Sequence, residues 1–186
     1  MKILSLFCRS SVFHGQLEQS RVRLYRVAYS WCHDAALADD LVQETLSKAL
    51  KNAGQLRDPE MLSSWLFTIL TNCWRDHFRQ FREMEDIEDL EDFRHAHAIT
   101  PEDEHAQTQI VARVRGAVAT LPLGQRQVLT LVDLEEFSYV EVAAILSIPV
   151  GTVMSRLCRA RRALKELLQE LAPQQAAQLS RIRRVK

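Results

Sequence analysis

The sequence has little glycine and proline, with five of each among its 186 residues. Few positions therefore favour tight turns or interrupt a helix. The aliphatic residues recur at helical rather than alternating spacing almost throughout, and no internal repeat is visible. These patterns predict an all-α protein.

Close cysteine pairs are also absent. The four cysteines, Cys8, Cys32, Cys73 and Cys158, stand far apart, which argues against a zinc finger or a redox motif. Cys73 and His77 lie four residues apart on one expected helix. That spacing could hold a metal ion, but packing of Cys73 in the core is the favoured interpretation. We expect free thiols in a reducing cytoplasm.

Long apolar runs and catalytic motifs are missing as well. The apolar start, MKILSLFCRSSVF, is interrupted by Arg9 and is too short to span a membrane, so we expect no membrane insertion. The sequence contains no nucleophile elbow, phosphate-binding loop or paired metal motif, which leaves a helical hydrolase or metal enzyme without support. We therefore expect no enzyme, no catalytic residue, no metal and no cofactor.

An excess of one charge is missing overall, because 24 Lys and Arg residues balance 24 Asp and Glu residues. The balance conceals a segregation of charge. Residues 83–107 hold ten acids against the single base Arg94, whereas residues 152–186 hold nine bases against Glu166 and Glu170. An acidic middle and a basic end create opposite local fields.

The hydrophobic periodicity divides the chain into two helical units. Helices are expected at about 17–32, 36–50, 61–82, 107–121 and 122–134, with two more between 138 and 171. The expected organisation is an N-terminal domain (1–82), an acidic flexible linker (83–107), a C-terminal domain (108–172) and a basic tail (173–186) that frays at its end.

Residues 138–168 predict two helices joined by a tight turn. Ser138 and Glu141 fit a capping box, and Pro149 is tolerated where the second helix begins. The apolar positions expected to face inward on the second helix are Val150, Val153, Leu157, Ala160, Leu164, Leu168 and Leu171. The opposite face carries Thr152, Ser155, Arg156, Arg159 and Arg162. This pattern is typical of a DNA-binding helix-turn-helix, although a solvated arginine face is the alternative.

Two earlier helices carry polar faces of different character. The helix at 61–82 presents Thr68, Asn72, Arg75 and Arg79, with Trp65, Phe67 and Trp74 interspersed. Such groups suit a nucleic-acid strand, because arginines bind phosphates and aromatic rings stack on unpaired bases; aromatics packed in the core are the alternative. The helix at 36–50 is more acidic and suits a protein-docking surface, unless it is simply a solvated face.

Four segments, in this order and spacing, resemble the extracytoplasmic-function (ECF) class of bacterial RNA polymerase sigma factors. They are DDLVQETL (39–46), WLFTILTN (65–72), LP with QRQVL (121–122 and 125–129), and GTVMSRL with RAR (151–157 and 159–161). The resemblance covers about residues 17–171. It implies two small helical domains joined by a linker, and a protein that lends promoter specificity to RNA polymerase.

The resemblance also implies three binding surfaces. Core polymerase would bind through Asp39, Asp40, Leu41, Gln43, Glu44 and Ser47, on the clamp helices of the largest subunit, with the beta flap as a further contact. Trp65, Thr68, Asn72, Arg75 and Arg79, with the loop at 54–64, would melt the −10 element and hold a flipped base of the non-template strand. Thr152, Met154, Ser155, Arg156 and Arg159 would contact the duplex −35 element. An anti-sigma factor is an implied partner.

Met154 departs from the family pattern, in which Lys or Arg usually precedes the Ser-Arg pair. A methionine cannot neutralise a phosphate, so the −35 preference of relatives is in doubt at this position. The rival to the sigma-factor interpretation is a helix-turn-helix regulator with a helical sensing or dimerisation domain. That rival explains residues 121–171 equally well but leaves the motifs at 39–46 and 65–72 without a role.

Overall fold

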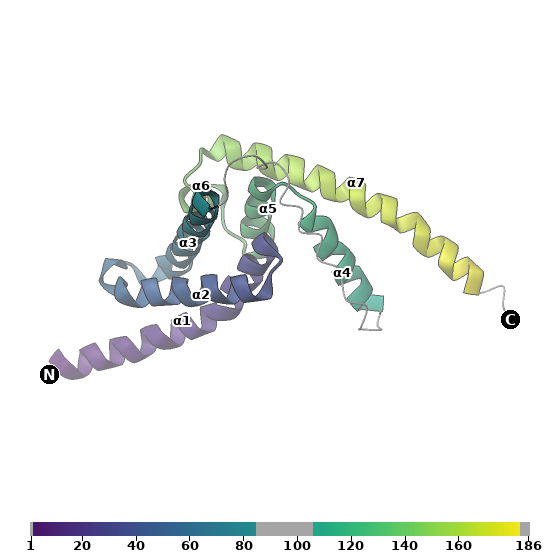
Figure 1. The fold of residues 1–186 in the computed structure, drawn as a ribbon. Helices are drawn as coiled ribbons and strands as arrows, with labels where there is room; N and C mark the ends of the chain where they lie inside the picture. The colour runs from purple at the N-terminus through teal and green to yellow at the C-terminus, as the bar shows by residue number, and fades with distance from the viewer. Residues whose placement is uncertain (1, 85–105, 183–186) are drawn as a thin grey trace.

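A computed structural model describes the backbone of residues 2–84 and 106–182 and the side chains of residues 12–79 and 111–169. Every regular element in these stretches is helical, as predicted. In chain order they are α1 (Lys2–Cys32), α2 (Ala35–Lys51), η1 (Ala53–Gln55), η2 (Pro59–Met61), α3 (Leu62–Met84), α4 (Ala106–Ala119), α5 (Leu123–Leu129), η3 (Thr130–Leu134), α6 (Tyr139–Leu146) and α7 (Val150–Ile182). Figure 1 shows α7 running past the other helices toward the C-terminus.

The N-terminal helices begin where the sequence supplies caps or lacks breakers. α1 begins at Lys2 rather than at about Leu17, because no proline interrupts this segment and a single interior glycine costs only about 1 kcal/mol. α2 starts after Asp34, whose side chain accepts a hydrogen bond from the Leu37 amide at 3.0 Å. The acidic linker predicted at 83–107 lies mostly outside the described residues.

The capping box predicted for the helix-turn-helix is confirmed. The Glu141 amide donates to Ser138 Oγ at 3.3 Å, and the Ser138 amide donates to the Glu141 carboxylate at 2.8 Å. α6 ends at Leu146, and the C-cap residue Ser147 adopts the left-handed conformation with φ 52°. α7 then starts directly after Pro149, where a missing amide hydrogen costs nothing.

Replacing Ser138 with alanine is expected to lower the free energy of unfolding by about 1 kcal/mol, the usual value of an N-cap hydrogen bond. Hydrogen bonds from Ser138 hold the pKa of Glu141 below its ordinary value. The stabilisation is therefore present above the ordinary glutamate pKa and is lost as pH falls through the lowered one. Urea unfolding at several pH values measures the difference. Ser47→Ala, within α2, is the control and is expected to stabilise slightly.

The segment between α5 and α6 differs from the single helix predicted at 122–134. α5 ends at Leu129, and η3 continues it as a π-helical turn, with the Glu135 amide donating to Thr130 O at 3.1 Å. The wider turn leaves Leu134 45% exposed and Glu135 only 7% exposed. A carboxylate is thus turned inward at this point.

One continuous hydrophobic core joins helices from both ends of the chain. It includes Leu24, Leu41 and Leu66 from the first three helices and Val128, Val142 and Leu157 from the last three. α1 packs on α2, α4 and α5, and α3 packs on both α2 and α6. The two predicted units therefore lie against each other.

Most of the apolar positions predicted to face inward do so, with corrections on two helices. Val150 and Leu168 on α7 are 38% and 37% exposed, because they lie at the edges of the stripe whose centre is buried at Val153, Leu157 and Ala160. On α4, helical spacing also predicts that Val111 and Val114 face inward, but both are exposed and Ala117 is buried in their place. α7 also continues through Pro173 to Ile182, past the end expected near Leu171.

Candidate functional site

α2 presents an exposed polar strip, here called the α2 strip. It consists of Asp39, Asp40, Gln43, Glu44 and Ser47. Leu41, which the sequence motif placed with them, is only 1% exposed. The prediction that Leu41 is a surface-binding residue is therefore wrong. Leu41 lies two residues from Gln43 and so points to the opposite side of the helix. Leu41 instead anchors α2 in the core.

Glu44 within the α2 strip is part of a charge network. The Lys48 ammonium lies 2.8 Å from the Glu44 carboxylate and 3.6 Å from that of Asp76 on α3. The hydrogen bond to Glu44 raises the pKa of Lys48 above its ordinary value, so the lysine stays charged at any physiological pH. This network fixes the strip against α3.

α3 carries the second predicted surface, here called the α3 row: Trp65, Thr68, Asn72, Arg75 and Arg79. Asn72, Arg75 and Arg79 are exposed, while Trp65 and Thr68 are half-buried. Phe67 and Trp74 are 2% and 3% exposed. These two rings are core residues and are not available to stack on a base.

Two arginines of the α3 row already have partners. Arg79 lies 3.3 Å from the Asp76 carboxylate, one turn away on the same helix. Arg75 donates a hydrogen bond to the backbone oxygen of Leu146, the last residue of α6. The row therefore touches the turn of the helix-turn-helix.

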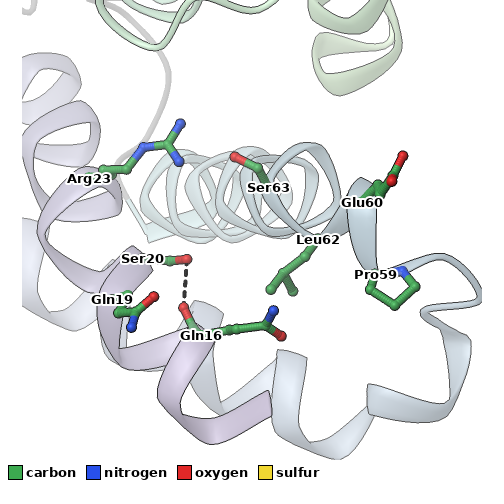
Figure 2. A pocket seen from close by; sticks show the side chains of 8 residues that line it. All are labelled: Gln16, Gln19, Ser20, Arg23, Pro59, Glu60, Leu62 and Ser63. Atoms are coloured by element: carbon green, nitrogen blue, oxygen red, sulfur yellow. Dashed lines mark hydrogen bonds between the residues drawn. The ribbon is translucent and has the colours of Figure 1, made fainter. Parts of the chain in front are cut away.

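A shallow polar pocket lies beside the start of α3 (Figure 2). Its volume is about 400 Å³, and its walls come from α1 on one side and from η2 and the first turn of α3 on the other. The lining residues are Gln16, Gln19, Ser20, Arg23, Pro59, Glu60, Leu62 and Ser63. Amide, hydroxyl and guanidinium groups here can bond to a polar ring inserted from solvent.

The N-terminal half of α7 carries the third predicted surface, here called the recognition face: Thr152, Met154, Ser155, Arg156 and Arg159. Met154 is 54% exposed and Arg159 is also exposed. Arg156 is half-buried against Gly124 of α5, where an added Cβ would lie 3.0 Å from its Nη1. Arg159 is therefore the freer of the two guanidinium groups.

Arg161, which belongs to the same sequence motif, has a structural partner. Its guanidinium lies 2.5 Å and 3.1 Å from the two oxygens of Asp133 in η3. This paired geometry raises the pKa of Arg161 above its ordinary value. Arg161 thus ties α7 to the segment that precedes α6.

Three residues that are not among the predicted binding residues are buried where the two units meet. Trp31, Arg126 and Glu135 are 2%, 8% and 7% exposed. Arg126 belongs to the segment 125–129 that resembles the family, but no local pattern separates it from surface arginines. A charged residue three positions before the buried Leu129 is the single available hint.

Comparison with known proteins identifies the two units. Residues 17–83 match the family model described as Sigma-70 region 2, and residues 112–164 match Sigma-70, region 4. The ECF RNA polymerase sigma factor EcfG of Rhodopseudomonas palustris (strain TIE-1) is 41% identical over 143 residues, which cover 76% of each chain. The chain belongs to the ECF RNA polymerase sigma factors. The RNA polymerase sigma-H factor of Pseudomonas aeruginosa is 36% identical over 75% of this sigma factor and 77% of its own length.

Solved structures show the same fold as this sigma factor. The sigma factor RpoE from Bartonella quintana, in complex with the anti-sigma factor NepR, has a TM-score of 0.64 and 31% identity over 84% of this chain and 96% of its own. CnrH, in complex with the cytosolic domain of CnrY, has a TM-score of 0.62 and 28% identity over 87% and 90%. The likeness spans both units.

In the stretches whose structure is described, no single helix is long and apolar enough to cross a membrane. Tyr139–Leu146 and Val150–Gln169 reach that length and composition only as a pair, which is bent by 104° at the break.

Proposed function

We propose that the three surfaces divide the work of a sigma factor. The α2 strip binds core RNA polymerase, the α3 row with the pocket beside it engages the −10 element, and the recognition face reads the −35 element. The observation that carries this division is the exposure of three chemically distinct faces on three different helices. The protein lends specificity to the polymerase and catalyses no reaction itself.

The α2 strip suits a protein partner rather than DNA. It contains three carboxylates and no positive charge, and phosphates would be repelled by such a face. We infer that the clamp helices of the polymerase's largest subunit are its partner, on the strength of the family resemblance. The Lys48 network with Glu44 and Asp76 supports this role, because it holds the strip in one orientation.

The α3 row and the pocket suit a strand opened from duplex DNA. Unstacking a base costs a few kcal/mol, which contacts in a pocket must offset. The pocket is large enough for a nucleobase, and the Gln16 side-chain amide on its wall offers a donor and an acceptor for a base edge (Figure 2). Asn72 and Arg79 on the row can bind the adjoining backbone.

The recognition face suits the major groove of duplex DNA. Exposed Arg159 and Met154 lie near the N-terminal end of α7, the part of a recognition helix that reaches base edges. A methionine offers an apolar contact to a thymine methyl group instead of a phosphate contact. The beta flap of the polymerase is a further proposed contact of this unit.

An anti-sigma factor is a proposed partner, because the solved relative RpoE from Bartonella quintana is bound to one. A sigma factor that acts on polymerase and DNA works in the cytoplasm, which is the proposed location.

Reconstituted transcription tests the proposed function. The purified chain is added to core polymerase on a library of promoter fragments, and start sites are mapped. We expect initiation from a defined subset of promoters that depends on the added chain. A helix-turn-helix regulator would instead bind duplex operator DNA alone, as a dimer, and would leave core polymerase without promoter-specific initiation.

A further inference from the structure

The helix α5 contains a glycine that its backbone does not require. Gly124 is the second residue of α5, and no glycine in the described stretches has a positive φ. A left-handed turn is therefore not the reason for a glycine at this position. In an ordinary helical conformation glycine is less favourable than alanine, because it loses more conformational freedom when the chain folds. Gly124 thus lowers the stability of α5, and the reason for it lies outside the backbone.

The surroundings of Gly124 come from α7, which packs on α5 (Figure 1). If Gly124 carried a Cβ atom, the three nearest heavy atoms would be Nη1, Cζ and Nε of Arg156, at 3.0, 3.1 and 3.4 Å. Favourable contacts between nonbonded heavy atoms are about 3.5–4.0 Å long. A side chain at position 124 would therefore push the guanidinium group of Arg156 away from α5.

The guanidinium group of Arg156 turns its flat face toward Gly124. The missing Cβ would lie at nearly equal distances from the central carbon and from two nitrogens. Such a point lies over the plane of the group, because at its edge the central carbon would be farther away than both nitrogens. The N–H groups of a guanidinium point outward in its plane. Contact through the face thus leaves these donors available to another partner.

Arg156 has no polar partner among the residues whose side chains are described. Its nitrogens are not among the buried polar atoms that lack a hydrogen bond, so they are open to solvent. Arg161 on the same helix is different, because both oxygens of Asp133 bind its guanidinium group. Arg156 is held in place by its contact with Gly124, and its hydrogen-bonding capacity is unused.

The other residues of the recognition face offer few hydrogen-bond donors. The Met154 side chain has none, and Ser155 Oγ already donates to the backbone oxygen of Thr152 at 3.1 Å. Arg156 and Arg159 therefore supply most of the donors that can reach base edges or phosphates. The position of the Arg156 group depends directly on the residue at position 124.

We infer that Gly124 is a specificity-determining residue for the −35 element, and that it acts as a positioning residue by giving the Arg156 guanidinium group a flat surface on α5. The inference rests on the proposed −35 role of the recognition face. A long side chain that is already in place loses less conformational freedom when DNA binds. A guanidinium group pushed off α5 keeps its charge but no longer presents its donors in one direction. Binding to a specific sequence is then reduced more than binding to DNA in general.

Gly124→Ala tests the inference, because its expected effects on stability and on DNA binding have opposite signs. Alanine is favourable at a helical position, and the flexible arginine side chain can move aside, so the midpoint of urea unfolding is expected to rise. The affinity of the polymerase–sigma complex for a promoter with an intact −35 element is expected to fall by about 3- to 10-fold, which is part of the value of an arginine contact to a base. Affinity for a promoter with a scrambled −35 element is expected to be unchanged.

The matched control is Gly15→Ala, because a Cβ added at this position of α1 would meet no neighbouring heavy atom within 4 Å. This variant is also expected to raise the unfolding midpoint, but to leave the affinity for both promoters unchanged. An equal loss of −35 affinity in both variants would show that the loss does not come from the contact with Arg156. A lower unfolding midpoint in Gly124→Ala would show that the glycine serves the packing of α5 on α7, and would overturn the inference.

A double-mutant cycle shows whether Gly124 acts through Arg156. Because Arg156→Ala also uncovers part of α5, the cycle compares the effect of Gly124→Ala in the presence and in the absence of the arginine. We expect the loss of −35 affinity when Arg156 is present, and a change of at most about twofold when it is absent. Equal losses in the two backgrounds, or no loss in either, would contradict the inference.

The same measurements separate the role of Gly124 from the proposed function. If Arg156→Ala and Arg159→Ala both leave −35 affinity unchanged, the recognition face does not read this element and both proposals fail. If these variants bind the intact element more weakly while Gly124→Ala binds it like the unchanged chain, only the role of Gly124 is contradicted.

Discussion

Replacing Gln43 and Glu44 together with alanine is expected to weaken binding to core polymerase by about 10- to 100-fold. These residues lie at the centre of the α2 strip, and truncation of central polar groups in an interface typically costs about 1–3 kcal/mol in total. The loss is measured by titrating labelled chain with core polymerase and following fluorescence anisotropy. Binding of the same variant to an isolated duplex DNA fragment that carries the −35 element is expected to be unchanged.

The matched control removes another exposed ion pair, that of Glu18 and Arg21 on α1. Exposed pairs contribute about 0–1 kcal/mol to stability, so neither variant should unfold. Loss of Glu44 leaves Lys48 paired with Asp76. Unchanged affinity for core polymerase in the Gln43 and Glu44 variant would remove the α2 strip from the interface. An equal loss in the control would show that the effect is not specific to the strip.

Arg159→Ala is expected to reduce binding of a promoter with an intact −35 element by about 1–3 kcal/mol, the usual value of an arginine contact to a base edge. The structure directs this test to Arg159 rather than Arg156, because Arg156 is half-buried against Gly124 and its loss would also disturb α5. Affinity of the polymerase–sigma complex is measured on promoters with intact and scrambled −35 elements, and only the first is expected to weaken.

Salt dependence distinguishes the two ways in which Arg159 could act. If Arg159 contacts a base, its loss weakens binding only to the promoter with the intact −35 element. If it contacts a phosphate, its loss weakens binding to both promoters equally and lowers the slope of log affinity against log salt by about 1. The control is Lys165→Ala, an exposed cation on another side of α7. A loss of affinity for the intact element as large in Lys165→Ala as in Arg159→Ala would contradict direct reading by the recognition face.

Much of the fold could be predicted because it depends on local chemistry. The capping box at Ser138 and Glu141 and the apolar stripe at Val153, Leu157 and Ala160 are set by residues within one or two helical turns of each other. The helical periodicity could also have shown that Leu41 does not share the surface of the other residues in its motif. Positions 40, 43, 44 and 47 share one face, and Leu41 lies away from it.

The boundary between the regions could not be predicted from local patterns. Arg126 and Trp31 are 95 residues apart, and Arg23 and Glu135 are 112 apart. Whether such pairs meet depends on how the two units pack against each other, and no periodicity encodes that. The inward turn of Glu135 adds a further obstacle, because a π-helical turn shifts the face on which each later residue lies.

Whether the α2 strip and the recognition face have separate functions is tested most directly by measuring core affinity and −35 dependence for a variant of each surface in parallel. Core affinity and dependence of initiation on the −35 element are determined for the Gln43→Ala, Glu44→Ala chain and for the Arg159→Ala chain. The proposal predicts that the first variant loses core affinity and keeps −35 dependence once saturated with core, while the second does the reverse. If both variants lose the same single activity to the same extent, the two surfaces do not have separate functions.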